Sequence, residues 1–239
     1  MEFIVNALML RSVDYNENDK ILTLLTAEKG KISAGIKGVK KAAAKLKFAA
    51  QPFCFAEYVL AERGGKYTVI NASECESFYD LRTDINKFYA ASAAAEAANA
   101  LTFEGDECRE IFTESVKTMS EICRGGESMA LIHFLLSALK QSGYGINAEN
   151  CAQCGSELFG ADRLKFDMDA GSFTCVECGK GLGASRVTYN VLRKAQGKTF
   201  EDDFISADGE KRALRLLREY VSYKLNIAFK SLSEYIRLI

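Results

Sequence analysis

The sequence predicts an α+β, multidomain fold, in which a short β-rich region is followed by helices and by an inserted module with four paired cysteines. Three observations support this prediction. Short apolar segments rich in β-branched and aromatic residues fill residues 1–72. From residue 85 onward, apolar residues recur at helical spacing. Two C-x-x-C-G motifs separated by 20 residues then follow the helices. A chain of 239 residues is long enough for one large domain or for two to three small ones.

Residues 1–72 are predicted to form five strands. Gly64 and Gly65 form a turn pair typical of a tight hairpin between the last two strands. Five strands without a long intervening helix suit a small barrel of the OB (oligonucleotide/oligosaccharide-binding) type. Another small barrel or a curved sheet fits the same pattern nearly as well. The expected strands are Phe3–Leu10, Lys20–Thr26, Lys31–Ile36, Phe53–Glu62 and Lys66–Asn71.

The next region, residues 73–146, is predicted to be helical. Ile85–Leu101 is rich in alanine and lacks Gly and Pro, which favours a helix. Glu107–Cys123 has apolar residues at helical spacing, and Ser128–Ser142 is apolar on all sides, as expected of a buried helix. The single histidine, His133, lies in this third helix and is expected to be packed in the core.

The C-terminal region, residues 187–239, is predicted to supply helices that pack back on the helical domain. Its longest segment, about Asp208–Ser231, carries Leu214, Leu217, Val221, Leu225 and Ala228 on one face. Residues 147–186 are then left as an inserted module. The acidic pair Asp202 and Asp203 is expected to be solvated.

The inserted module contains the strongest chemical signal, which is formed by Cys151, Cys154, Cys175 and Cys178. Two intervening residues bring both thiolates of a pair to one side, and the following glycine lets backbone amides turn toward sulfur. Two such pairs complete a tetrahedral shell for one Zn²⁺ ion, and a closed shell of this kind is structural and not catalytic. A redox pair, an iron–sulfur cluster and coincidence are the alternatives, although a redox pair normally stands alone at a helix start. The other cysteines, Cys54, Cys75, Cys108 and Cys123, are expected to be small buried hydrophobes.

A run of lysines marks the β-rich region. It comprises Lys29, Lys31, Lys37, Lys40, Lys41, Lys45 and Lys47, and no acidic residue occurs between Glu28 and Glu57. Such a run beside a barrel predicts a track for a phosphate backbone, with a solvated charged loop as the alternative. Base stacking is expected from barrel aromatics such as Phe53, Phe55, Tyr58 or Tyr67, unless these are core residues. A helical stripe of Arg212, Arg215 and Arg218 is predicted to be exposed, either as a solvated face or as a second DNA contact.

The distribution of charge predicts separate surfaces for separate partners. Residues 1–70 have a balance of +4, residues 71–149 of −7 and residues 150–239 of +2, although the whole chain carries only −1. The N-terminus lacks the pattern of a signal peptide, and no long apolar run occurs, so a cytoplasmic protein without membrane contact is expected. No nucleophile–base set or cofactor fingerprint is present, which predicts a protein that is not an enzyme.

Several of these segments resemble, in order, those of the bacterial RecO recombination-mediator family. The resemblance covers nearly the full length. It rests on Leu22–Thr26, Gly30-Lys31, Gly35–Lys41, Gln51–Phe53, Gly143–Gly145, both cysteine pairs, Phe166 to Gly171, and Tyr220, Leu225 and Lys230–Leu232. Two departures concern the lysine run, where Lys40 and Lys41 replace paired arginines and Ala42–Ala44 replaces a polar stretch.

The resemblance implies an N-terminal OB-fold, a helical domain and an inserted zinc finger. It implies binding of single- and double-stranded DNA, promotion of strand annealing, and a nucleoid-associated location. It also implies partnership with RecR and with the C-terminal tail of single-stranded DNA-binding protein, and through these a role in loading RecA onto covered single strands. A zinc-ribbon transcription or translation factor and a protein-interaction scaffold remain alternatives, which a DNA-binding assay with salt titration separates from the mediator.

Overall fold

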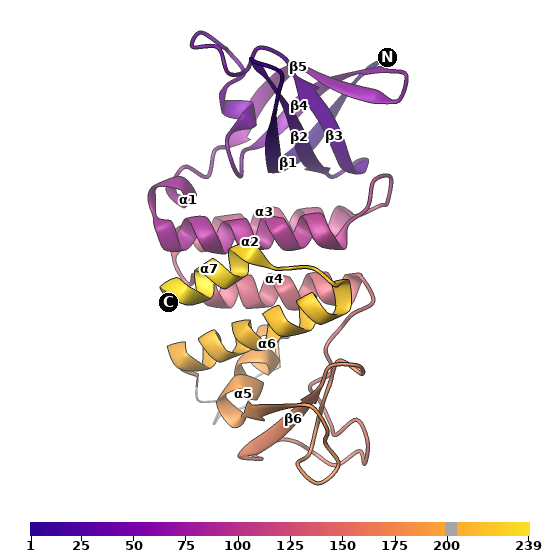
Figure 1. Cartoon of the computed structure of the whole chain (residues 1–239), viewed down its shortest axis with the longest axis vertical. Coiled ribbons are helices and arrows are strands. Elements are labelled where there is room, and N and C mark those ends of the chain that lie inside the picture. Colours follow the sequence, from indigo (N-terminus) through magenta and orange to yellow (C-terminus); the bar gives the residue numbers. More distant parts are fainter. Residues whose placement is uncertain (199–204) are drawn as a thin grey trace. The chain divides into compact units, whose positions relative to one another are not determined.

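The fold is described from a computed structural model of the chain (Figure 1), for residues 1–198 and 205–239. Asp202 and Asp203 lie outside the described residues. The chain forms two compact units, Met1–Glu127 and Ser128–Ile239. The division at residues 72, 146 and 186 that the sequence suggests stays a prediction.

A closed five-stranded barrel forms the first part of unit Met1–Glu127. Around the barrel the strands follow the order β1-β2-β3-β5-β4, and β4 returns to pair with β1. All pairs are antiparallel except β3 with β5. This architecture confirms the predicted OB-like barrel and the α+β class. The strands are β1 (Glu2–Tyr15), β2 (Asp19–Thr26), β3 (Gly30–Ile36), β4 (Phe55–Arg63) and β5 (Lys66–Glu76).

The barrel closes around alternating apolar side chains. Leu22 and Leu24 of β2 and Leu60 of β4 are fully buried, because every second residue of a strand faces the interior. The predicted hairpin turn is present, with positive φ at both Gly64 and Gly65, as a type I′ turn requires. The barrel core therefore leaves the intervening residues of β2, β3 and β5 on the outer surface.

The connection from β3 to β4 carries most of the lysine run and is tied to the barrel by apolar residues. Val39 is only 3% exposed, and Leu46 packs against the core cluster. A 3₁₀ turn, η1 (Phe48–Ala50), follows, and the Tyr58 hydroxyl donates a hydrogen bond of 2.8 Å to the Ala49 carbonyl. The connection is thus anchored at both ends, and its lysines point away from the core.

Three helices complete unit Met1–Glu127: α1 (Asp80–Thr83), α2 (Ile85–Leu101) and α3 (Arg109–Arg124). The bounds of α2 are those predicted, because Asp84 caps its N-terminus by accepting from the amides of Asn86 and Lys87. Seven alanines of α2 are buried, so this helix packs closely against its neighbours. The short α1 was not predicted.

Unit Ser128–Ile239 combines helices with a small sheet. The sheet has the order β7-β6-β8, and α4 is buried on most sides, as predicted. His133 of α4 is half-buried, with Nδ1 2.8 Å from the Ala195 carbonyl oxygen, so it lies at the edge of the core. The elements are α4 (Glu127–Gln141), β6 (Arg163–Asp167), β7 (Ser172–Thr174), β8 (Leu182–Ser185), α5 (Arg186–Ala195), α6 (Ala207–Leu225) and α7 (Lys230–Leu238).

The prediction of a single long C-terminal helix is wrong, because two helices, α6 and α7, occupy this region. Asn226 adopts the left-handed conformation with φ of 52°, which ends α6 after Leu225. Ala228 therefore lies outside α6, whereas Leu214, Leu217 and Val221 are buried as predicted.

The four isolated cysteines do not share one environment. Cys54 and Cys108 are buried as expected, but Cys75 is exposed and Cys123 is only partly buried. Cys75 lies near the end of β5, where four consecutive residues, Ser73–Glu76, are exposed, so its burial was predicted wrongly. Among residues 1–198 and 205–239, no helix has the length and apolarity needed to cross a bilayer.

Candidate nucleic-acid interface and metal centre

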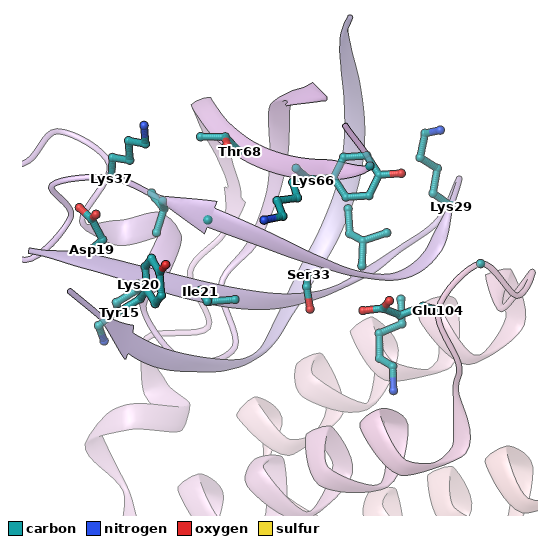
Figure 2. A pocket seen from close by; sticks show the side chains of 17 residues that line it. Tyr15, Asp19, Lys20, Ile21, Lys29, Ser33, Lys37, Lys66, Thr68 and Glu104 are labelled. Atoms are coloured by element: carbon teal, nitrogen blue, oxygen red, sulfur yellow. The ribbon is translucent and has the colours of Figure 1, made fainter. Parts of the chain in front are cut away.

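A cleft of about 850 Å³ runs over the outer surface of the barrel (Figure 2). Ile21 of β2, Ser33 of β3 and Thr68 of β5 line it, together with Gly65 of the hairpin turn. These residues alternate with the buried ones of the same strands, so the barrel fixes their direction. We call this cleft the barrel groove.

Five lysines line the barrel groove: Lys20, Lys29, Lys31, Lys37 and Lys66. Lys29 and Lys37 lie at opposite ends of β3 (Figure 2), whose seven residues span about 23 Å at roughly 3.3 Å per residue. Lys20 and Lys66 were missed by the sequence prediction, because each stands alone and outside the lysine run. Their position at the first residues of predicted strands was the available signal.

Two tyrosines, Tyr15 and Tyr67, are the aromatic residues of the barrel groove. Tyr15 is 54% exposed, and Tyr67 is partly buried, with its ring edge-on to Phe3 at 5.6 Å between centroids. Such rings can stack on bases. Tyr15, at the end of β1, was not among the predicted aromatics.

Three of the four predicted stacking residues lie elsewhere. Phe53 and Tyr58 are 3% and 0% exposed, so they belong to the core. Phe55 packs edge-on against Phe112 of α3 at 5.9 Å between centroids. The structure therefore corrects the expectation for these three, and only Tyr67 of the four lines the groove.

Lys31 is held by the helical part of the same unit. Its Nζ donates a 2.6 Å hydrogen bond to the carbonyl of Asn99 near the C-terminal end of α2, and burial lowers the pKa of its ammonium group. This geometry places Lys31 as an anchor between β3 and α2. Lys29 is exposed, with Nζ 4.6 Å from the centroid of the Phe3 ring.

Two acidic residues also line the barrel groove. Asp19 accepts a 2.7 Å hydrogen bond from the amide of Gly38, which lowers the pKa of its carboxyl group and fixes the start of the lysine connection. Glu104, from the segment between α2 and α3, forms isolated β-bridges with Gly30 and Lys31. Glu104 therefore places a negative charge at one end of the groove (Figure 2).

The other predicted lysines lie on the connection after β3. Lys40 forms a 2.7 Å ion pair with Asp14. Lys41 lies with Lys37 in a smaller depression, and Lys41, Lys45 and Lys47 are exposed. The predicted set thus divides between the groove and the connection, and its role in binding stays a prediction.

The four paired cysteines come together in unit Ser128–Ile239. The Sγ atoms of Cys151, Cys154, Cys175 and Cys178 all lie within 4.8 Å of one another. Cys175 Sγ lies 3.8 Å from the Sγ atoms of both Cys151 and Cys154. A tetrahedral site with bonds of about 2.3 Å requires sulfur–sulfur distances of roughly 3.8 Å. The group can therefore hold a metal ion.

Backbone amides and neighbouring thiols tune this sulfur cluster. The amides of Cys154 and Cys175 lower the pKa of the Cys151 thiol to about 6, and the Ser156 hydroxyl lowers that of Cys154. The neighbouring sulfur atoms of Cys175 and Cys154 raise the pKa of Cys178 to about 12. Four thiolates this close repel one another, and a dication offsets that repulsion.

The glycine after each cysteine pair has its own physical reason. Gly155 has φ of +71°, which side-chain-bearing residues rarely adopt. Gly179 is needed for space instead, because an added Cβ would lie 2.6 Å from Cβ of Lys165 and would collide with the Thr174 hydroxyl. The sequence predicted that both glycines are needed for their backbone conformation, and this reason holds for Gly155 but not for Gly179.

Comparison with known families decides the relationships of the chain. Residues 82–233 match the family described as recombination protein O C terminal, and residues 1–79 match recombination protein O N terminal. The chain belongs to the RecO family.

Individual RecO relatives show how far the similarity extends. The DNA repair protein RecO of Desulfitobacterium hafniense (strain DSM 10664 / DCB-2) is 35% identical over 173 residues, which are 72% of this chain and 63% of that protein. The one from Clostridium novyi is 29% identical over 237 residues, which are 96% of this chain and 92% of that protein. The one from Clostridium perfringens is 31% identical over 189 residues, which are 77% of this chain and 76% of that protein. The match thus spans under two thirds of the first relative and nearly all of the second.

The predicted arginine stripe of α6 is only partly exposed. Arg212 and Arg215 are exposed, and Arg212 forms a 2.5 Å ion pair with Asp208. The side chain of Arg218 is 31% exposed and forms an ion pair with Glu219. The DNA contact considered for this stripe stays a prediction.

Proposed function

We propose that this RecO protein is a non-catalytic mediator of DNA repair and recombination that binds single- and double-stranded DNA through its barrel. The barrel groove carries this proposal, because it joins lysines at both ends of β3 to two tyrosines on one open surface. Lysines that neutralise phosphates release condensed counterions, and aromatic rings stack on bases of any sequence. Both contacts are independent of base identity, as a repair mediator requires.

Binding of this kind leaves the pairing edges of the bases free. A single strand held by its backbone and by stacking can still pair with a complementary strand, which supports a role in annealing. We assign the loading of RecA onto covered single strands to the same activity, in partnership with RecR and single-stranded DNA-binding protein.

The acidic region, residues 71–149, is proposed as a docking surface for proteins because of its balance of −7. The C-terminal tail of single-stranded DNA-binding protein is acidic, so its pocket needs local cations. Lys117, Arg124 and Lys140 are exposed cations in this stretch. A labelled tail peptide should bind the wild-type protein at modest salt, and absence of binding contradicts this part of the proposal.

The four cysteines are proposed to hold one structural Zn²⁺ ion. The sulfur–sulfur distances of 3.8 Å fit a four-thiolate tetrahedron. Four protein ligands leave no position for a substrate or for an activated water molecule, so the metal would supply folding energy and not catalysis.

A strand-annealing assay tests the proposed function. Complementary strands coated with single-stranded DNA-binding protein should anneal faster with the wild-type protein than without it. The groove variant Lys37→Ala/Lys66→Ala should lose most of this acceleration. The control Arg11→Ala/Arg109→Ala removes two exposed cations of the same unit that do not line the groove, and it should anneal like the wild type.

A further inference from the structure

A second cationic cleft, of about 700 Å³, lies within unit Ser128–Ile239. Its walls are the outer face of β6 with the neighbouring β8, and one face of α6. None of its residues belongs to the barrel groove or to the four-cysteine cluster. We call it the β6–α6 cleft.

Two pairs of cations face the β6–α6 cleft. Arg163 and Lys165 lie two residues apart on β6 and flank the buried Leu164, so both point outward. Residues spaced in this way lie about 6.8 Å apart, at roughly 3.4 Å per residue. Arg212 and Arg215 lie three residues apart on α6, which places them on one face of the helix. The cleft therefore has a cationic pair on each wall.

These cations are available to a ligand. Within residues 1–198 and 205–239, the side chains of Arg163, Lys165 and Arg215 form no hydrogen bond or ion pair. Arg212 pairs with Asp208, but the two side chains are 50% and 63% exposed, and such surface pairs are weak enough to exchange.

Acidic and apolar residues complete the lining. Asp162 and Glu219 are the acids of the cleft, and Glu219 is already held in an ion pair by Arg218. Val176 and Leu182, 48% and 42% exposed, offer apolar surface beside the cations. A ligand that combines regularly spaced negative charges with flat apolar groups fits this lining.

We infer that the β6–α6 cleft is a second nucleic-acid site, which binds the phosphodiester backbone of a strand separate from the one in the barrel groove. A nucleic acid is favoured over an acidic peptide for two reasons. Its phosphates recur at a regular spacing that the cation pairs on both walls can follow. Three of the four cations are arginines, whose planar guanidinium groups bind phosphate oxygens in pairs.

This inference rests on the proposed function and adds a mechanism to it. A chain with one strand in the barrel groove and another in the β6–α6 cleft brings two strands together, which raises the local concentration of each for pairing. A chain with one site must instead wait for a second strand from solution. The cleft should therefore affect annealing more than it affects binding of one strand.

The experiment uses the full-length cleft variant Arg163→Ala/Arg215→Ala, which removes two exposed side chains. The matched control Lys194→Ala/Arg237→Ala removes two exposed cations of the same unit outside the cleft. Both pairs of substitutions are introduced into the wild-type protein and into the groove variant Lys37→Ala/Lys66→Ala. Metal content and thermal unfolding verify that each protein is folded. Affinity for a fluorescent single-stranded oligonucleotide is measured against salt, together with the annealing rate.

In the groove variant, adding the cleft substitutions should flatten the remaining salt slope by about 1.4, at roughly 0.7 for each lost phosphate contact. In the otherwise wild-type protein, the cleft substitutions should slow annealing several-fold. The control substitutions should change neither the salt slope nor the annealing rate. Unchanged slope and annealing in the cleft variants overturn the inference.

Two further outcomes separate the inference from the alternatives. A labelled poly-glutamate peptide that binds the wild type but not the cleft variant, with DNA affinity unchanged, makes the cleft a peptide site and also overturns the inference. If the groove variant binds DNA like the wild type but the cleft variant does not, the β6–α6 cleft stands and the barrel assignment fails.

Discussion

At the scale of single residues, Tyr67 is the one of the four predicted stacking residues that lines the barrel groove. It lines the barrel groove near the start of β5 and packs partly buried against the barrel core, whereas Phe53 and Tyr58 are fully inside the core. The reason lies in position along the strand, since Tyr67 is the second residue of β5, near its end, whereas Tyr58 lies in the middle of β4. Strand propensity cannot distinguish a tyrosine in the middle of a strand from one near its end, because the depth of burial depends on how the closed barrel assembles.

Replacement of Tyr67 by Leu should weaken binding of single strands by about 1–3 kcal/mol, because a base loses its stacking partner. The salt slope should stay unchanged, since no charge is removed. Tyr67→Phe keeps the ring and should bind like the wild type. Tyr79→Leu removes an exposed tyrosine outside the groove and serves as the control. Equal losses for Tyr67→Leu and Tyr79→Leu, measured by fluorescence anisotropy, argue against stacking in the groove.

Glu104 is the residue whose role no sequence pattern indicated. It lines the barrel groove, and its backbone forms isolated β-bridges with Gly30 and Lys31. Gly30 is required there, because its φ is +66° and an added Cβ would collide with the carbonyl of Asp106. These contacts join residues about 70 positions apart in the sequence, so local patterns could not reveal them.

Glu104→Gln should tighten binding of single strands at low salt, because it removes a negative charge from the path of the phosphates. The gain should shrink as salt rises, since the field of an exposed charge is screened within about 8–10 Å near physiological ionic strength. Glu107→Gln changes an exposed acid of the same segment that does not line the groove and is the control. Equal affinities of Glu104→Gln and the wild type at low salt would contradict this role.

At the scale of elements, the sequence predicted correctly those helix and strand bounds that are set by residues within the same segment. Helix α2 has the predicted bounds, because Asp84 and the alanine run define it within its own segment. The five strands were found, but β1 continues to Tyr15 because it pairs with β2 through Asp19. The end of α6 was missed, because only the left-handed Asn226 stops the helical pattern there.

The lysine connection shows a second limit of prediction from sequence. Its charge predicted a phosphate track or a solvated loop, but not that Val39 and Leu46 fix the connection to the barrel core. Asp19 and Asp14 further hold Gly38 and Lys40. The available signal was the presence of apolar residues such as Val39 inside a charged run. Such a residue can be buried only against the barrel, which is formed by strands distant in the sequence.

At the scale of the whole molecule, the cysteine cluster is a test of how metal and folding are coupled. The two cysteine pairs are separated by 20 residues in the sequence; β6 and β7 of the small sheet lie between them, and β8 follows the second pair. Spacing alone predicted the cluster, because two C-x-x-C-G turns suffice to define four converging thiolates.

Cys154→Ser should lose the metal and destabilise unit Ser128–Ile239 by several kcal/mol, because metal binding and folding are linked. Cys75→Ser, which changes an exposed and isolated cysteine, should keep both metal and stability. Elemental analysis and thermal unfolding measure the two effects. Well under one zinc per chain in wild-type protein purified without chelator contradicts the zinc assignment.

The central claim is that the barrel groove binds the DNA backbone, and the salt dependence of single-strand affinity tests it most directly. If four or five lysines contact phosphates, the log–log slope should be about −3 to −4, at roughly −0.7 per contact. Lys37→Ala/Lys66→Ala should flatten this slope by about 1.4, more than Lys41→Ala/Lys45→Ala on the connection does, while Arg11→Ala/Arg109→Ala leaves it unchanged. A slope for Lys37→Ala/Lys66→Ala equal to that of the wild type would show that DNA binds elsewhere on the molecule.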